Sequence, residues 1–170
     1  MNFTPPIWAL ALTYWLHLLA VVTWVGSLAG ISFLILPAMQ RSLDPDTQLI
    51  FIEAMQKRLE PIAWFSMSLL LVTGLFQMSV NPHYDGFLST STQWSLAILI
   101  KHLLGIIMVV VSAIQTWEVI PAIRRAILKS KKSNNAEELD TLRRREIFLL
   151  RMNFGLAILI LLATAFARAS

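Results

Sequence analysis

The feature that most constrains this chain is a long run without charge near its start. From Ile7 to Leu36 there are thirty residues with no Asp, Glu, Lys or Arg, and His17 is the only one that titrates near neutral pH. About twenty apolar residues are enough for a helix to cross the hydrocarbon core of a bilayer. The run therefore predicts a membrane-spanning helix that is long enough to tilt.

Three further apolar runs follow the first, at residues 62–80, 94–123 and 147–167. Backbone polar groups that face lipid must be satisfied within the segment, so runs of this length form helices. The chain is 56% hydrophobic and 14% charged, which also favours lipid over water as its surroundings. We therefore expect an all-α fold, an integral membrane four-helix bundle in which residues 1–170 form a single four-span domain.

The basic residues are distributed unevenly between the connections. Residues 38–60 and 124–146 hold all but three of the fourteen Lys and Arg, whereas residues 81–93 hold none. Short basic connections stay on the cytoplasmic side of a membrane. Both termini and residues 81–93 are therefore predicted to face outward from the cell (plasma or inner) membrane. The basic run lacks interleaved aromatics and a nucleic-acid motif, so we expect it to contact anionic lipid and not nucleic acid.

The connection 38–60 is predicted to be largely helical. Asp44 is a good N-cap and Pro45 suits the first position of a helix. Apolar residues then recur at helical spacing. The stretch is either an amphipathic helix at the inner surface or an extension of the second span, and Pro61 is expected to kink or break it.

Three polar groups interrupt the first and third spans at a similar depth. His17 lies ~15 Å into the first span, and Lys101 and His102 lie ~10 and ~12 Å into the third. Ionisable groups inside a bilayer cost about 2.5–3.5 kcal/mol on insertion scales and mark functional sites. If the two spans pack together, these groups form one cluster. We take all three as candidate cofactor-binding residues, and His17 and His102 as candidate metal ligands.

Two imidazoles on facing helices suit haem b or a copper ion. Interhelical hydrogen bonds are the alternative explanation for both histidines. Lys101 could extend to the membrane surface or pair with a carboxylate such as a haem propionate. All four spans contain glycine, which has no side chain and leaves room beside the helix backbone. This indicates either close helix packing or space for a flat ligand. The glycines are Gly26, Gly30, Gly74, Gly105 and Gly155.

Glu118 and Arg151 form a second candidate cluster near the basic connections. They are predicted as an inner ion pair, either structural or involved in proton or ion passage, with Arg143 to Arg145 as alternative partners. Soft Cu(I) binds thioethers and thiolates, and the chain has no cysteine. Its methionines lack the regular spacing of a relay, so we expect them to fill the core. Those within or near the spans are Met39, Met67, Met78 and Met108.

Three segments together resemble the copper resistance D (CopD) family. In the first span, Leu16-His17 is followed by Trp24-Val25-Gly26, and the run continues to Leu36-Pro37. The run Ile100 to Gly105, with Lys101 and His102, resembles the lysine-bearing third helix of that family. The ending from Arg151-Met152-Asn153 to Ala169 resembles its last helix. The resemblance implies a four-helix membrane protein that handles copper.

A more distant likeness is to the HemJ-type protoporphyrinogen oxidases. That family shares the histidine on helix one and the lysine on helix three. The likeness implies haem b near His17 and Lys101, with electrons passing to a quinone or a redox partner. The family's L-P-R ending of helix one is missing, because Ala38 follows Leu36-Pro37.

Three functions remain open at this point. The first is copper transport or resistance through an intramembrane His/Lys site. The second is a haem-b redox protein, and the third is a non-catalytic subunit of a larger membrane complex. The sequence does not decide whether the protein is an enzyme, since it has no hydrolytic triad, phosphate-binding loop or dinucleotide fingerprint.

Overall fold

The computed structural model describes residues 5–84, 86–130 and 136–169, and in these the regular elements are all helical. The elements are α1 (Ile7–Ala29), η1 (Gly30–Ile35), α2 (Leu36–Ser42), α3 (Pro45–Ser79), α4 (Gln93–Ile114), η2 (Gln115–Val119), α5 (Ile120–Ser130) and α6 (Ala136–Ala169). Because α1, η1 and α2 follow one another without a break, they form one rod. The same holds for α4, η2 and α5, so the fold consists of four rods.

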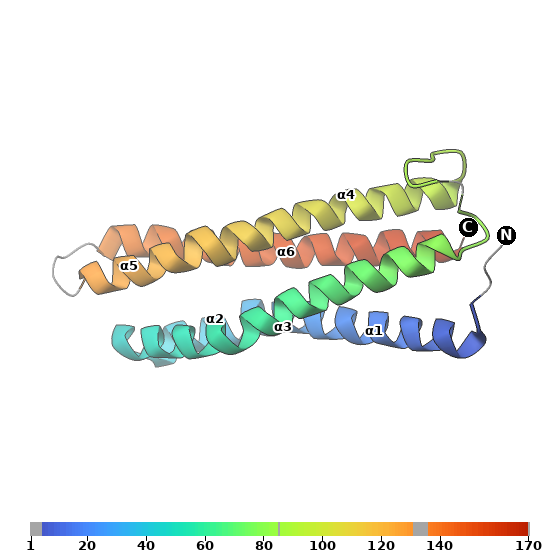
Figure 1. The fold of residues 1–170 in the computed structure, drawn as a ribbon. Coiled ribbons are helices and arrows are strands. Elements are labelled where there is room, and N and C mark those ends of the chain that lie inside the picture. The colour runs from blue at the N-terminus through green and yellow to red at the C-terminus, as the bar shows by residue number, and fades with distance from the viewer. Residues whose placement is uncertain (1–4, 85, 131–135, 170) are drawn as a thin grey trace.

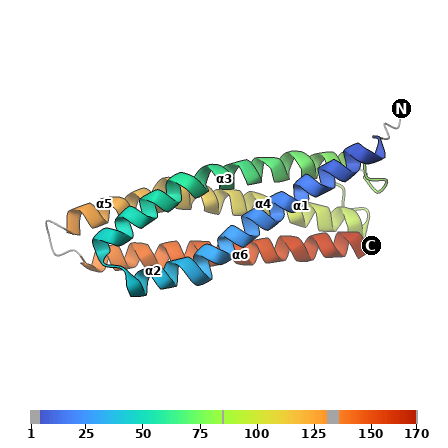
Figure 2. The same ribbon diagram turned by 90° about the horizontal axis from the view of Figure 1, so that it is seen from below.

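The four rods lie side by side along one long axis (Figures 1 and 2). One end of the molecule holds the start of α1, the end of α6 and the connection 81–93 (Figure 1). We call it the terminal end. The opposite end holds α2, α5, the start of α3 and the start of α6 (Figure 1). We call it the basic end. The start of α1, the end of α6 and the described part of the 81–93 connection therefore share an end of the bundle (Figure 1).

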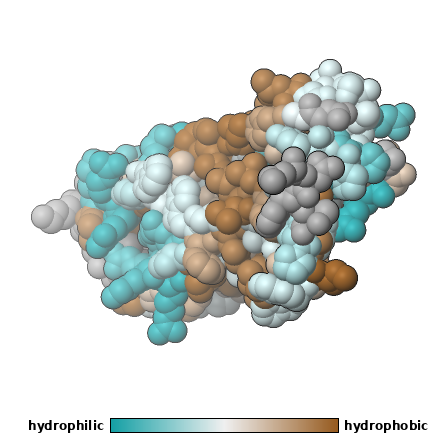
Figure 3. Space-filling model, turned by 45° about the vertical axis from the view of Figure 1, so that its right-hand side comes forward, coloured by the Kyte–Doolittle hydropathy of each residue, from teal (hydrophilic) through white to brown (hydrophobic). Residues whose placement is uncertain are grey.

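The surface matches a bilayer. Four helical segments are long and apolar enough to cross a membrane, at Ile7–Ser42, Ile50–Ser79, Gln93–Lys129 and Glu137–Ala169. Many large apolar side chains on them face outward. Leu18, Val22 and Ile106, for example, are 61–67% exposed. Figure 3 shows a hydrophobic band across the middle of the molecule between hydrophilic ends. The predicted membrane bundle of four spanning helices is confirmed.

Helix α3 is longer than the predicted second span. The Asp44 carboxylate caps its start by accepting a hydrogen bond of 3.0 Å from the backbone N–H of Thr47. The helix then continues through Pro61 to Ser79. Of the expected kink or break, the break does not occur, because a proline removes one backbone hydrogen bond and neighbouring turns of a membrane helix support the rest. Residues 45–60 therefore extend the second span.

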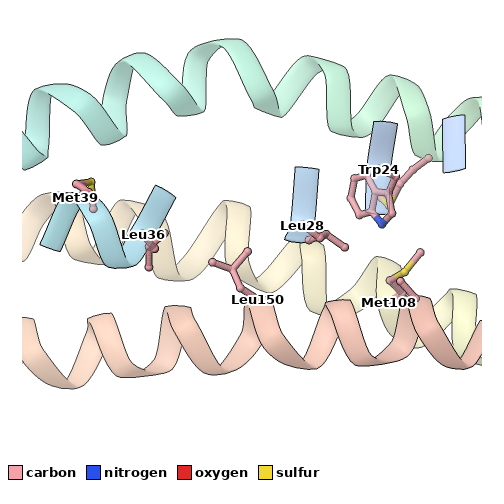
Figure 4. Close-up of a cluster of buried hydrophobic side chains, with 8 residues drawn as sticks. Trp24, Leu28, Leu36, Met39, Met108 and Leu150 are labelled. Carbon is pink, nitrogen blue, oxygen red and sulfur yellow. The ribbon is translucent and has the colours of Figure 1, made fainter. Parts of the chain in front are cut away.

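The rods pack mainly as two hairpins. Helix α3 packs along α1, and α6 packs along α4 and α5; contacts between the hairpins are fewer and run chiefly from α6 to α1 and η1. In the described part of the chain, α1 does not pack along α4. A cluster of buried apolar side chains joins the hairpins. It comprises Trp24, Leu28, Leu36, Met39, Met67, Met108, Leu150 and Ala157 (Figure 4).

Two rods contain π-helical turns, η1 in the first and η2 in the third. A π turn widens the helix by one residue and often occurs at functional sites in otherwise regular helices. Both turns lie toward the basic half of the molecule. They shift the register of the side chains that face the bundle interior there.

Candidate functional site

His17 lies on the face of α1 that packs into the bundle. Ala20, Trp24 and Leu28 follow it at intervals of three and four residues and are all buried. This spacing places the four side chains on one stripe of the helix. His17 itself is half-buried at the top of this stripe, toward the terminal end.

The imidazole of His17 is oriented by α3. Its Nδ1 lies 2.8 Å from Oγ1 of Thr73, and that hydroxyl lies 2.5 Å from the backbone carbonyl of Leu69. A carbonyl oxygen can only accept a hydrogen bond, so the single hydroxyl proton of Thr73 is used in the bond to Leu69. His17 Nδ1–H therefore donates to Thr73, and Nε2 keeps its lone pair. A hydrogen bond to one ring nitrogen that frees the other is the usual support of a metal-binding histidine.

Gly74 of α3 lies against the imidazole of His17. A Cβ atom at this position would stand 3.5 Å from Cε1 of His17. The other glycines of the membrane helices, Gly26, Gly30, Gly105 and Gly155, have open space where a side chain would begin. Of the expected small-residue contacts within the chain, Gly74 against His17 is therefore the one that forms.

Lys101 faces the same interior from α4. It shares a stripe of that helix with Ala97 and Met108, which are both buried. Its ammonium group is near enough to His17 and to Arg168 for their charges to interact. The Arg168 guanidinium in turn lies over the Tyr14 ring, 5.3 Å from its centroid. We call this group the terminal polar layer: Tyr14, His17, Thr73, Lys101 and Arg168.

His102 lies on a neighbouring face of α4. Its Nδ1 donates a hydrogen bond of 2.7 Å to the backbone carbonyl of Ile98, so its Nε2 also keeps a lone pair. Its ring packs against Phe87, with centroids 4.9 Å apart. Consecutive helical residues are rotated by ~100°, so the turn that aims Lys101 inward aims His102 toward the 81–93 connection. The structure thus brings Lys101 rather than His102 toward His17.

A second layer of candidate ligands lies deeper along the same stripe. Trp24 shares a buried cluster with Met67 of α3 and Met108 of α4, both 8% exposed. In Figure 4, the Met108 thioether lies below the Trp24 indole at one end of the cluster. We call Trp24, Met67 and Met108 the sulfur layer. Sequence spacing could not reveal it, because its methionines come from different helices.

The basic end carries the ion pairs. Glu118 pairs with Arg145 at 2.8 Å, and Glu53 pairs with Arg124 at 2.7 Å. Arg151, the partner expected from the sequence, is exposed on another face of α6. Six residues separate it from Arg145, which rotates it by ~240° around the helix. Glu118 therefore pairs with one of the alternative arginines.

The described residues contain no group of three or more His, Asp or Glu side chains placed to hold a metal ion. The terminal polar layer offers the imidazole of His17, and the sulfur layer offers the thioethers of Met67 and Met108. Both are ligands that copper accepts, and thioether favours Cu(I).

Comparison with known proteins adds the family. The family model described as "Copper resistance protein D" matches residues 53–167, which include Lys101, His102, Glu118 and Arg151. His17 and Trp24 lie outside the matched residues. No curated protein and no solved structure matches this chain significantly. The match covers well over half of the chain, and with the four membrane-spanning helices it leads to one conclusion: this multi-pass membrane protein belongs to the copper resistance protein D family.

Proposed function

We propose that this protein moves copper through the bundle, or holds it there, by way of the terminal polar layer. The observation that carries the proposal is the hydrogen bond between His17 and Thr73. It leaves a neutral imidazole with Nε2 available as a ligand, in a half-buried position inside a membrane helix. Membership of the copper resistance family makes copper the ion to test first.

The roles of Lys101 and His102 differ in this proposal. A copper ion at His17 Nε2 lies within the field of the Lys101 ammonium group, which repels it and so weakens binding. A weaker site releases its ion more readily, which suits passage. His102 lies beside the 81–93 connection under Phe87 and acts as an entry ligand, ahead of His17.

The sulfur layer supplies the next position. Trp24 lies seven residues beyond His17, which is ~10 Å deeper along the helix. Two thioethers favour Cu(I), and the electron-rich indole face attracts a cation. Copper taken at His17 can therefore move toward the basic end without crossing a purely aliphatic core.

The basic end faces the cytoplasm in this proposal, since it holds nearly all the basic side chains. Arg124, Arg125 and Lys129 are exposed there and contact anionic lipid headgroups. The resulting direction is from outside to inside, through His102, His17 and the sulfur layer in turn.

The test is copper analysis of the detergent-purified protein, with an absorbance spectrum on the same sample. His17→Ala is expected to lose most of the bound copper and His102→Ala part of it. His83→Ala, in the outer connection, is the matched control and keeps the full amount. Full copper in both of the first two variants would exclude the proposed site. A Soret band with sharp reduced α and β bands would instead identify a haem-b protein. Protein without copper or haem, made with both available, would favour an accessory subunit.

A further inference from the structure

A cavity of about 120 Å³ lies in the half of the bundle toward the basic end, and of the residues in the copper proposal only Trp24 lines it. All four rods line it, including residues of the η1 and η2 turns. On the same measure, one water molecule needs roughly 10–15 Å³, so the space exceeds that of a packing defect.

The polar lining of this cavity is made of oxygen and amide groups. Glu60 of α3 and Glu146 of α6 contribute carboxyl groups, and Gln56 and Gln115 contribute amides. Glu146 is 7% exposed and therefore deeply buried for a carboxyl side chain. Carboxylate and amide oxygens are ligands for hard cations, whereas Cu(I) prefers sulfur. The cavity thus differs in chemistry from the sulfur layer.

A residue that lines the same space carries an unsatisfied acceptor. Asn153 is 1% exposed, and its Nδ2 donates a hydrogen bond of 2.7 Å to Oγ of Ser112. Its Oδ1 is buried and has no hydrogen-bond partner among the described residues. A buried acceptor without a partner is costly unless a bound species satisfies it. Both Asn153 and Ser112 line the cavity.

The charges around the cavity set the charge of that species. Glu60 and Glu146 contribute two negative charges when ionised. The positive group that acts on Glu146 is Arg143, whose guanidinium also donates to the side-chain oxygen of Gln48 at 2.5 Å. Burial favours the neutral form of Glu146, so the count applies when a bound cation keeps both carboxyl groups ionised: two carboxylates and one guanidinium then leave one negative charge. We infer that the cavity binds a single hard monovalent cation of the alkali type, such as Na⁺, between Glu60, Glu146 and Asn153 Oδ1.

The inference is tested without copper. Purified protein is titrated with NaCl against choline chloride at constant ionic strength, and the unfolding midpoint is followed. Binding of ²²Na⁺ is measured on the same preparation. We expect a saturable rise of the midpoint and stoichiometric ²²Na⁺ binding. Glu146→Gln and Glu60→Gln are each expected to weaken Na⁺ binding at least tenfold.

Glu118→Gln is the matched control, because this carboxylate pairs with Arg145 and does not line the cavity. It should bind Na⁺ as the unmodified protein does. If Glu146→Gln does not fold, Glu60→Gln on the other hairpin decides. The inference is overturned if Na⁺ and choline act alike, which would mean that the cavity holds water alone. It is also overturned if Mg²⁺ or Ca²⁺ binds more tightly than Na⁺, or if both cavity variants keep full Na⁺ binding.

Discussion

The Nδ1 of His17 lies 2.8 Å from Oγ1 of Thr73, so a side chain in the middle of α1 is oriented by a residue near the C-terminal end of α3. The Thr73 hydroxyl in turn donates a hydrogen bond to the backbone carbonyl of Leu69, one turn back along α3. The arrangement fixes both the tautomer and the plane of the imidazole. It also ties the proposed ligand to the helix that packs most closely against α1.

Replacement of Thr73 tests this orientation. Thr73→Val keeps the shape but removes the acceptor, so His17 loses its fixed tautomer. We expect copper affinity to fall by about 10–100-fold, the usual effect of losing a supporting hydrogen bond of a metal ligand. Competition with a colorimetric Cu(I) chelator measures the change. Thr73→Ser keeps the hydroxyl and should stay close to the original affinity; equal losses in both variants would argue against the role of the hydroxyl.

The size of residue 74 is a second test of the same contact. A methyl group at Gly74 would meet Cε1 of His17 at 3.5 Å, an ordinary van der Waals distance. Gly74→Ala should therefore retain copper binding, whereas Gly74→Leu should displace the imidazole and reduce binding sharply. Gly155→Leu is the control, because that position opens onto free space. Unchanged copper binding in Gly74→Leu would show that the ring position is not needed.

The charge of Lys101 provides a prediction of opposite sign. Lys101→Leu removes a positive charge near His17, keeps an apolar side chain on the buried stripe of α4 and adds no copper ligand. We expect tighter copper binding and slower release, since like charges repel at low dielectric constant. The measurement is copper affinity together with uptake into proteoliposomes. Weaker binding in Lys101→Leu would contradict a purely electrostatic role for the lysine.

The orientation in the membrane can be tested directly because the chain has no cysteine. Single cysteines at Thr90 and Lys129, both exposed, mark the terminal and basic ends. A membrane-impermeant maleimide should label Thr90→Cys on intact cells, and Lys129→Cys only after permeabilisation. Labelling in the reverse order would invert the proposed direction of copper movement.

The bond between Asn153 and Ser112 tests how the two antiparallel helices of the second hairpin hold together. The amide of Asn153 is 2.7 Å from the Ser112 hydroxyl, which donates to the carbonyl of Met108 at 2.8 Å. A double-mutant cycle of Asn153→Ala and Ser112→Ala should give a coupling of about 1 kcal/mol, typical of hydrogen bonds between membrane helices.

By contrast, Glu118→Gln should change stability by under ~1 kcal/mol, because the pair with Arg145 is about half exposed. Unfolding in mixed detergent measures both.

The fold was largely predictable because hydropathy and charge act over long segments. A run without charge must be a helix in lipid, and the basic connections predict which ends of the rods lie together. The N-cap at Asp44 is a local signal and is confirmed. The effect of Pro61 on the helix could not be predicted from the sequence alone, because neighbouring turns and helices decide whether a proline ends a helix.

The site was less predictable because it depends on which helices are neighbours. Depth along the membrane placed His17, Lys101 and His102 at one level, but depth does not fix rotation about the helix axis. Lys101 faces inward while the adjacent His102 packs on Phe87. Met67 and Met108 belong to the same buried cluster as Trp24 although they come from different helices, and Gly74 of α3 lies against His17 of α1. No spacing within one segment encodes such contacts.

The division into two hairpins has a consequence for biogenesis. Helix α1 pairs with α3, and α4 and α5 pair with α6, so most contacts join segments that leave the ribosome one after the other. Each hairpin can insert and close before the other is complete. The sulfur layer and the cation cavity both span the boundary between hairpins, so they come into existence only when the hairpins dock. The proposed binding of copper and of the cation would therefore report the last step of assembly, and a chain stalled as two inserted but undocked halves would be helical and membrane-bound but would lack both sites.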